Sequence, residues 1–312
     1  MTTQPSLISV QKIWDEAEFN AFTDLIFYQG RWMCVFRESN AHQYGSNGSI
    51  RIIASADGKT WESLALFREE GVDLRDPKLC ETPDGRLMLL MGGTVYDGKT
   101  YVTRQPRATF SSDGEQWLPL TLVLEPHEWL WRVTWHQGKA YGVSYRQSDP
   151  RRIKRRWIIT LFVSDDGVHY SPLKSWPLTH YPNETTLRFL PNGEMVALVR
   201  RERKRKAPAL IGISKPPYTR WKWESSHLYF GGPNFIVLDD QSMWAGGRVV
   251  EGEKEMTVLA AMSFNSLQPV LVLPSGGDTS YPGMVYRNGV LWMSYYSSHE
   301  GKTSVYLARI RL

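Results

Sequence analysis

The sequence predicts an all-β fold, a six-bladed β-propeller of four-stranded antiparallel blades that forms a single domain over residues 1–312. Three observations support this prediction. A turn motif recurs along the chain, six strand–turn–strand units follow one another, and no long window shows the apolar spacing of a helix. The 13 Trp and 15 Tyr residues fit short strands, because aromatic side chains favour a pleated, half-buried surface.

The recurring motif is a hairpin turn. It reads Ser55-Ala-Asp-Gly-Lys-Thr-Trp61 and returns at Ser111–Trp117 and Ser164–Tyr170, with weaker copies that begin at Ser214 and Ser263. In such a turn the Asp carboxylate can accept hydrogen bonds from backbone N–H groups, and Gly takes the left-handed conformation. The motif therefore predicts a fold element, and no catalytic role is expected for its Asp residues, which are Asp57, Asp113 and Asp166.

The second repeat is a pair of apolar strands joined by a tight turn such as Asp84-Gly85 or Asn192-Gly193. The six copies are Ala21–Arg37, Asp76–Gly92, Arg132–Tyr145, Glu184–Arg200, Asn234–Gly247 and Tyr281–Tyr295. Two further strands after each copy complete a blade. The last blade lacks an outer strand, which the run Leu7–Trp14 is predicted to supply, closing the ring.

Charge and composition limit the classes of partner that the chain is expected to have. The net charge of +5 and pI of about 9.1 weakly favour an anionic partner and do not indicate nucleic acid. The basic runs 151–156 and 200–206 are either solvated loops or a surface that meets an acidic polymer or membrane. The two cysteines are expected to be free thiols, and no metal spacing, phosphate loop or dinucleotide fingerprint occurs, so no cofactor is expected.

The chain shows no pattern of a signal peptide at its start, and no apolar run approaches the ~18 residues of a membrane span. A cytoplasmic location is expected on this basis.

Residues at the start of the innermost strands converge on one mouth of a propeller, where a rigid scaffold can hold a site. When the six copies are aligned on their turns, one position per blade faces this mouth. Its occupants are Thr23 or Asp24, Asp76, Trp131 or Arg132, Glu184, Asn234 and Tyr281. Most are polar or ionisable, which a purely structural repeat does not require.

The turn motif resembles the Asp-box, or BNR repeat, of the sialidase-like six-bladed propellers. That resemblance implies a Tyr nucleophile with a Glu partner, because a phenol with a pKa near ~10 is a weak nucleophile until a base takes its proton. Tyr281, in Thr279-Ser-Tyr-Pro-Gly283, is similar to the nucleophile, and Glu184 is similar to its partner. Arg200 resembles one of the three arginines that hold a sialic acid carboxylate.

The other two arginines of that triad are missing from their expected places, Ala21–Asp24 and Gly232–Asn234. Other side chains are therefore candidates for binding substrate, namely Arg37, Arg75, Arg132, Arg248, Asn234, His299 and Glu300. The general acid/base is left open among His42, Asp76 and Asp24.

Three functions fit these residues. The first is a sialidase-like glycoside hydrolase acting on an acidic or keto-acid sugar through Tyr281 and Glu184. The second is a polysaccharide lyase that uses Tyr, His and Arg side chains at the mouth. The third is a non-catalytic glycan-binding propeller, because a fold does not dictate a function.

Overall fold

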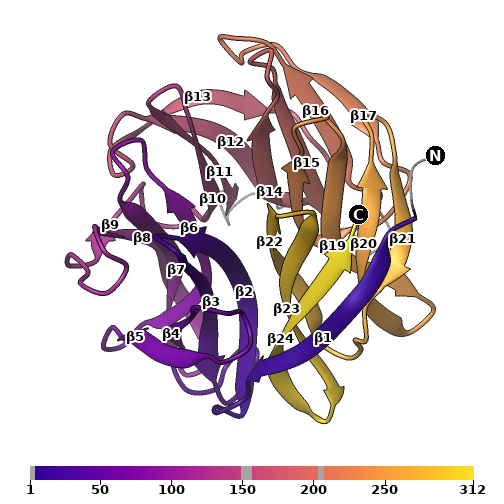
Figure 1. The fold of residues 1–312 in the computed structure, drawn as a ribbon. Coiled ribbons are helices and arrows are strands. Elements are labelled where there is room, and N and C mark those ends of the chain that lie inside the picture. The colour runs from indigo at the N-terminus through magenta and orange to yellow at the C-terminus, as the bar shows by residue number, and fades with distance from the viewer. Residues whose placement is uncertain (1–3, 149–156, 203–206) are drawn as a thin grey trace.

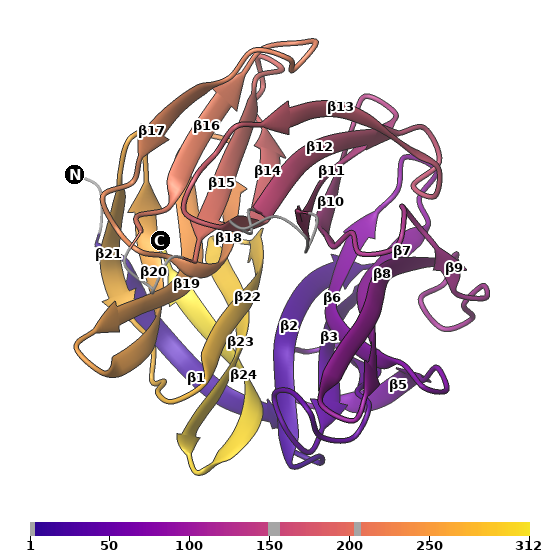
Figure 2. The same ribbon diagram turned by 180° about the vertical axis from the view of Figure 1, so that it is seen from behind.

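The computed structural model describes residues 4–148, 157–202 and 207–312, and these residues form strands and turns without a helix. The strands are arranged as six blades around a ring (Figure 1), seen from behind in Figure 2. The basic run 151–156 and most of 200–206 lie outside the described residues. No helix that could span a membrane was found in the part of the chain described.

Each blade is a four-stranded antiparallel sheet whose first strand lies innermost. Blade 1 contains β2 (Phe19–Tyr28), β3 (Arg31–Ser39), β4 (Ser49–Ser55) and β5 (Glu62–Phe67). Blade 2 contains β6 (Asp73–Glu81), β7 (Leu87–Asp97), β8 (Thr100–Ser111) and β9 (Thr121–Leu122). Blade 3 contains β10 (Leu130–His136), β11 (Lys139–Gln147), β12 (Trp157–Ser164) and β13 (Tyr170–Trp176).

The remaining blades follow the same order. Blade 4 contains β14 (Pro182–Phe189), β15 (Met195–Arg201), β16 (Leu210–Ser214) and β17 (Lys222–Ser225). Blade 5 contains β18 (Gly231–Val237), β19 (Met243–Glu251), β20 (Lys254–Met262) and β21 (Leu267–Val272). Blade 6 contains β22 (Thr279–Arg287), β23 (Val290–Glu300) and β24 (Lys302–Arg311), with β1 (Ser6–Trp14) as its outer strand.

The N-terminal strand closes the ring, as the sequence predicts. β1 pairs antiparallel with β24, from Ser6 opposite Arg311 to Trp14 opposite Val305. At the neighbouring edge, Phe19 of β2 meets Thr303 of β24, which joins the first blade to the last. The predicted six-bladed fold and its closure are therefore confirmed.

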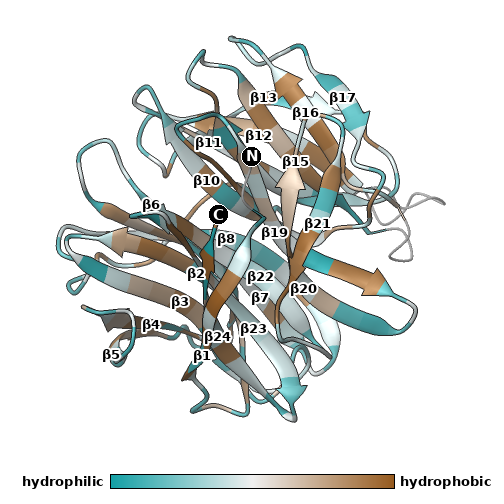
Figure 3. Cartoon of the chain, turned by 45° about the vertical axis from the view of Figure 1, so that its right-hand side comes forward, coloured by the Kyte–Doolittle hydropathy of each residue, from teal (hydrophilic) through white to brown (hydrophobic). Residues whose placement is uncertain are grey.

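Apolar side chains fill the junctions between blades. Val35 and Leu89 belong to the cluster between blades 1 and 2, and Leu198 and Phe235 belong to the cluster between blades 4 and 5. Burial of one such side chain stabilises the fold by about 1.5–3 kcal/mol. Figure 3 shows apolar residues along the strands and mostly hydrophilic hairpin tips. Stability is thus spread around the ring, which leaves the axis free for polar groups.

The repeated turns have the expected hydrogen bonds. The Asp57 Oδ1 atom accepts from the backbone N–H groups of Lys59 and Thr60 at 2.8 and 2.9 Å, and these bonds lower the pKa of the carboxyl. Asp113 and Asp166 accept equivalent bonds. These carboxylates are therefore engaged by their own turns. Cys34 and Cys80 are free thiols, as predicted.

Candidate active site

Every innermost strand has a β-bulge near its start, which breaks its register with the second strand. The breaks fall between Ala21 and Asp24, Arg75 and Lys78, Leu130 and Val133, Pro182 and Thr185, Gly231 and Asn234, and Ser280 and Gly283. A bulge re-aims side chains and is common beside active sites. Six equivalent bulges therefore ring one mouth of the propeller.

The backbone is left-handed at four of the six bulges, and at three of them the residue is not glycine. Phe22, Asp76, Gly232 and Tyr281 have φ values of 63°, 50°, 57° and 51°. For residues other than glycine this conformation costs of order 1–3 kcal/mol and is often retained at functional sites. Asp76 and Tyr281 thus occupy equivalent strained positions in blades 2 and 6.

In blade 5 the alignment on turns is displaced from the bulge by two residues, and in blade 1 it offers Thr23, which lies in the bulge, or Asp24, which follows it. The bulge positions there hold Phe22-Thr23 and Gly232-Pro233. Asp24 and Asn234 follow the bulge, where regular pairing resumes. The displacement arises because the stretch between the bulge and the hairpin turn differs in length from blade to blade. Pairing after the bulge runs from Asp24 to Tyr28 in blade 1 but only from Lys78 to Glu81 in blade 2.

Tyr281, Glu184 and Arg200 form one cluster, as the resemblance implies. The Tyr281 hydroxyl donates to Glu184 Oε1 at 2.6 Å, and Arg200 donates to the same oxygen at 2.7 Å. Arg200 also lies 3.2 Å from the Tyr281 hydroxyl. The other Glu184 oxygen accepts from the Gly232 backbone N–H at 3.0 Å, so both carboxylate oxygens are held.

Burial and electrostatics give these groups different tasks. Glu184 and Arg200 are each only 5% exposed, whereas Tyr281 remains partly open to solvent. Burial raises the pKa of Tyr281 and the Glu184 charge raises it further, while Arg200 opposes this shift. The phenol therefore keeps its proton at rest and directs it at Glu184.

Asp76 is the second partly exposed ionisable group at the bulges. Burial raises the pKa of its carboxyl, which Glu184 also raises, against the opposing charges of Arg75 and Lys78. Among the described residues, none is hydrogen-bonded to the Asp76 carboxylate. A carboxyl with a raised pKa holds its proton to a higher pH than an ordinary aspartate and can give that proton to a leaving group.

Lys78 was missed by the sequence analysis. It is 3% exposed, and its ammonium donates to the Pro77 carbonyl at 2.9 Å and lies 4.6 Å from the Trp131 ring centre. Burial lowers its pKa to about 8. Its place two residues after Asp76, on the alternate-residue pattern of a strand, was the available signal.

Arg37 and Arg75 converge on Asp73, which was also missed. Arg37 donates to Asp73 Oδ1 at 3.0 and 2.7 Å, and Arg75 lies 3.3 Å from Oδ2. Arg75 also donates to the His42 carbonyl at 2.9 Å. All three side chains are at least 90% buried. The charged stretch Asp73–Asp76 at the start of an inner strand could have indicated this anchor.

His42 reaches across the junction between blades 1 and 6. Its Nδ1 atom lies 2.5 Å from Asp278 Oδ2, and the other Asp278 oxygen accepts from the Tyr296 hydroxyl at 2.7 Å. Hydrogen bonds from His42 and Tyr296 help to lower the pKa of Asp278 despite its burial. Arg248 lies 3.7 Å from Asp278 and 2.9 Å from Glu255.

The remaining candidates lie outside the cluster around Tyr281. Asp24 and Arg132 form a two-pronged ion pair at 2.9 and 3.0 Å, with exposures of 1% and 6%. Asn234 is bonded to the Pro282 carbonyl and to Arg188. His299 contacts Ser297 and Tyr306, and Glu300 pairs with Lys12 of β1 on the outer side of blade 6.

No group of three or more His, Cys, Asp or Glu side chains that could hold a metal ion occurs among the described residues.

Solved structures share this architecture. The chain matches a protein of unknown function from Dyadobacter fermentans with a TM-score of 0.86, 17% identity and 99% coverage of both chains. It matches a mutant α-L-arabinofuranosidase from Fusarium graminearum, bound to an iminosugar inhibitor, with a TM-score of 0.72, 14% identity and 98% coverage of both. These likenesses show that the chain has the same six-bladed propeller fold.

A sialidase from Trypanosoma rangeli, bound to the inhibitor DANA, also matches, with a TM-score of 0.68 and 11% identity. The match covers 98% of this chain and 59% of the sialidase chain. No family model and no curated protein matches the sequence. The resemblance inferred from the turn motif therefore holds at the level of the fold.

Proposed function

We propose that this protein is a glycoside hydrolase in which Tyr281 is the nucleophile, Glu184 its base and Asp76 the general acid. The observation that carries the proposal is the division of the cluster by exposure. Tyr281 and Asp76 are partly open to solvent at equivalent bulges, whereas Glu184 and Arg200 lie buried behind the phenol. The exposed pair can touch a substrate, and the buried pair can act only through Tyr281.

In the first step the Tyr281 oxygen attacks the anomeric carbon while its proton passes to Glu184, 2.6 Å away. The bond from that carbon to the leaving oxygen breaks, and Asp76 gives this oxygen its proton. Water then attacks the glycosyl–tyrosine intermediate, with Asp76 taking a proton from the water and Glu184 returning one to the phenol. A tyrosine nucleophile is a known exception to the scheme of two carboxylates.

Arg200 supports both stages. Its guanidinium contacts Glu184 Oε1 and the phenol oxygen. It therefore stabilises the negative charge on either oxygen, whichever of the two has lost the shared proton. Glu202 and the Tyr229 hydroxyl hold its other side. This fixed arrangement costs no reorganisation when the reaction occurs.

Charge balance at the mouth favours a neutral sugar over the acidic or keto-acid sugar predicted from the sequence. Arg37 and Arg75 share Asp73, and Arg248 contacts two carboxylates. Arg200 likewise pairs with Glu184 and Glu202. A substrate carboxylate would have to compete with these partners. The similar arabinofuranosidase fold, and an arabinanase of Penicillium chrysogenum solved with arabinobiose, fit a neutral sugar.

The test is mass spectrometry of products from a panel of neutral and acidic glycans, with Tyr281→Phe as the control. We expect fragments that carry one added water, with turnover reduced by more than about 10³-fold in the variant. Fragments that sum to the substrate without added water would replace hydrolysis with the lyase hypothesis. Higher turnover on acidic than on neutral glycans would contradict the inferred sugar class, and glycan binding without products would leave a binding propeller.

A further inference from the structure

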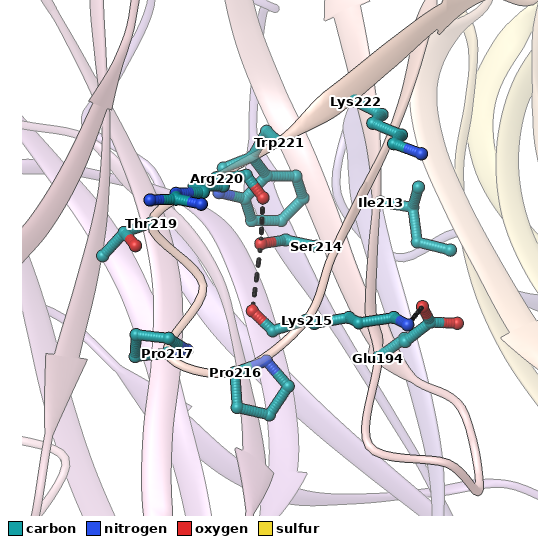
Figure 4. A pocket seen from close by; sticks show the side chains of 10 residues that line it. All are labelled: Glu194, Ile213, Ser214, Lys215, Pro216, Pro217, Thr219, Arg220, Trp221 and Lys222. Carbon is teal, nitrogen blue, oxygen red and sulfur yellow. Dashed lines mark hydrogen bonds and ion pairs between the residues drawn. The ribbon is translucent and has the colours of Figure 1, made fainter.

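One hollow of the described surface lies in the outer part of blade 4, away from the mouth. It is a cavity of about 790 Å³ beside the hairpin that joins β16 to β17 in blade 4, shown in Figure 4. Ser214, at the end of β16, pairs with Met195 at the start of β15, whereas Arg200 lies at the other end of β15. The span from Met195 to Arg200 is about 17 Å, so the hollow opens on the face opposite the catalytic cluster.

Positive charge predominates around this hollow. Lys215, Arg220 and Lys222 line it, and Glu194 is its one acidic lining residue. Lys215 lies 3.8 Å from Glu194, a long and solvated contact that is worth little. Among the described residues, neither Arg220 nor Lys222 takes part in an ion pair. Unpaired cations around a concave surface attract anions.

The wall of the hollow includes an indole. Trp221 is partly exposed, and its ring is fixed by stacking on Trp223 at 5.3 Å and by a bond from its Nε1 atom to the Tyr218 carbonyl. Figure 4 shows Arg220 on one side of the Trp221 ring and Lys215 and Lys222 on the other. Trp176 also packs on this ring at 4.8 Å, so the hollow presents the part of the indole that these contacts leave exposed, between two positive regions.

This arrangement selects a ligand larger than a simple ion. A cavity of this volume falls in the range of small-molecule sites, about 300–1,000 Å³. A sugar ring has an apolar C–H face that can pack on an indole, and carboxylates on neighbouring rings can reach cations on either side of it. One inorganic anion cannot contact both positive regions and the ring.

We propose that the hollow beside Trp221 is a second carbohydrate-binding site, which takes an acidic oligosaccharide with carboxylates on adjacent sugars. The Trp221 indole packs on a sugar ring, and Arg220 and Lys222 bind carboxylates on its two sides. This site does not depend on the proposed hydrolysis, because it shares no residue with the mouth.

The probe is trigalacturonate, titrated at low salt by calorimetry into the Tyr281→Phe chain. We expect Arg220→Ala/Lys222→Ala to weaken binding at least about tenfold, a loss of about 1.4 kcal/mol, with an unchanged melting temperature. The matched control is Lys59→Ala/Lys174→Ala, which removes two exposed lysine charges outside the hollow and should leave the affinity unchanged.

Two further titrations identify what the site recognises. Maltotriose, which has the same number of rings and no charge, should bind far more weakly, and so should inorganic sulfate. Equal affinity for maltotriose would overturn the role of the cations, and equal affinity for sulfate would reduce the hollow to a site for free anions. If the Arg220/Lys222 variant binds trigalacturonate as tightly as its control, the site is not at this hollow. Because binding is measured without turnover, these outcomes are independent of the proposed hydrolysis.

Discussion

The two ends of the inner strands differ in how closely the blades resemble one another. At the end away from the mouth, the blades turn through similar hairpins, with Gly30, Gly85, Gly138, Gly193 and Gly289 all at φ values of 76–80°. At the mouth the six bulges share a backbone position and differ in side chain, from Phe22 to Asp76 to Tyr281. The comparison teaches that repetition maintains the ring, and that chemistry lies where equivalent positions diverge.

The largest effect is expected when the Asp76 carboxyl is replaced by an amide, which cannot act as a general acid. We expect Asp76→Asn to lower turnover of ordinary glycosides by about 10²–10⁴-fold, because the leaving oxygen then departs unprotonated. Measured as kcat/KM, which reports the first step, the loss should be much smaller with a dinitrophenyl glycoside, whose leaving group needs no proton.

The pH profile gives a second measurement on the same variant. Burial raises the pKa of Asp76, and a general acid works only while protonated, so activity should fall as pH rises through that pKa. This alkaline limb should disappear in Asp76→Asn. An equal loss on both substrates would assign Asp76 to the structure of blade 2.

Substitutions in the ion pair between Asp24 and Arg132 test whether this pair stabilises the folded chain. Arg132→Met leaves Asp24 buried without its partner, so we expect the free energy of unfolding to fall by about 3–5 kcal/mol. Urea denaturation measures this loss. The double variant Asp24→Leu/Arg132→Met should recover part of it, and no recovery would show that the cost comes from packing.

Lys78 should oppose stability in a pH-dependent way. Its pKa is about 8 in the fold and 10.5 in the unfolded chain, so the unfolded chain binds more protons between these values. Stability should therefore rise with pH from about 8 to 10.5, by about 3 kcal/mol. Lys78→Met should remove this rise, and an unchanged pH profile of unfolding in the variant would contradict the assignment to Lys78.

The smallest expected effect is at the far end of the molecule. Gly58 has a φ of 70°, and an added Cβ would lie 2.5 Å from the Trp292 ring of blade 6. Gly85 has a φ of 79° and open space at the same place. Both Gly→Ala variants should lose about 1–2 kcal/mol from the left-handed backbone.

Gly58→Ala should lose more than this because Trp292 must move, and thermal unfolding measures the difference. Neither change should alter activity, because both turns lie away from the mouth. Equal losses would show that the Trp292 ring yields freely.

Features of the fold that leave a local or periodic pattern in the sequence could be predicted from it. The turn motif and the spacing of hairpins predicted six blades, and the missing outer strand predicted the pairing of β1 with β24. Tyr281, Glu184 and Arg200 were placed together by the resemblance to the sialidase-like propellers, which matched each to a point of a repeat unit, before an inner strand or at the end of the next.

The positions of the bulges, and the contacts between residues of different blades, could not be predicted from the sequence. The distance from bulge to hairpin turn differs between blades, so alignment on the turns selected Asp24 and Asn234, which follow the bulge and do not lie in it. Asp73, Lys78 and Asp278 act through neighbours on other blades, such as Arg37, Trp131 and His42. Contacts between segments so far apart in sequence leave no periodic trace, and only the folded ring shows them.

The closure of the ring also limits when the protein can become native. Strand β1 pairs with β24, which follows it by about 300 residues in the chain, so β1 cannot pair until that distant strand has been synthesised. Until then β1 presents unpaired backbone groups that can bind another chain. Blades 1 to 5 can form during synthesis, but Tyr281, in blade 6, meets Glu184 only once the final blade has docked. The cluster of Tyr281 and Glu184 is therefore assembled as a late event, and a chain whose ring failed to close would lack this cluster and be prone to aggregation.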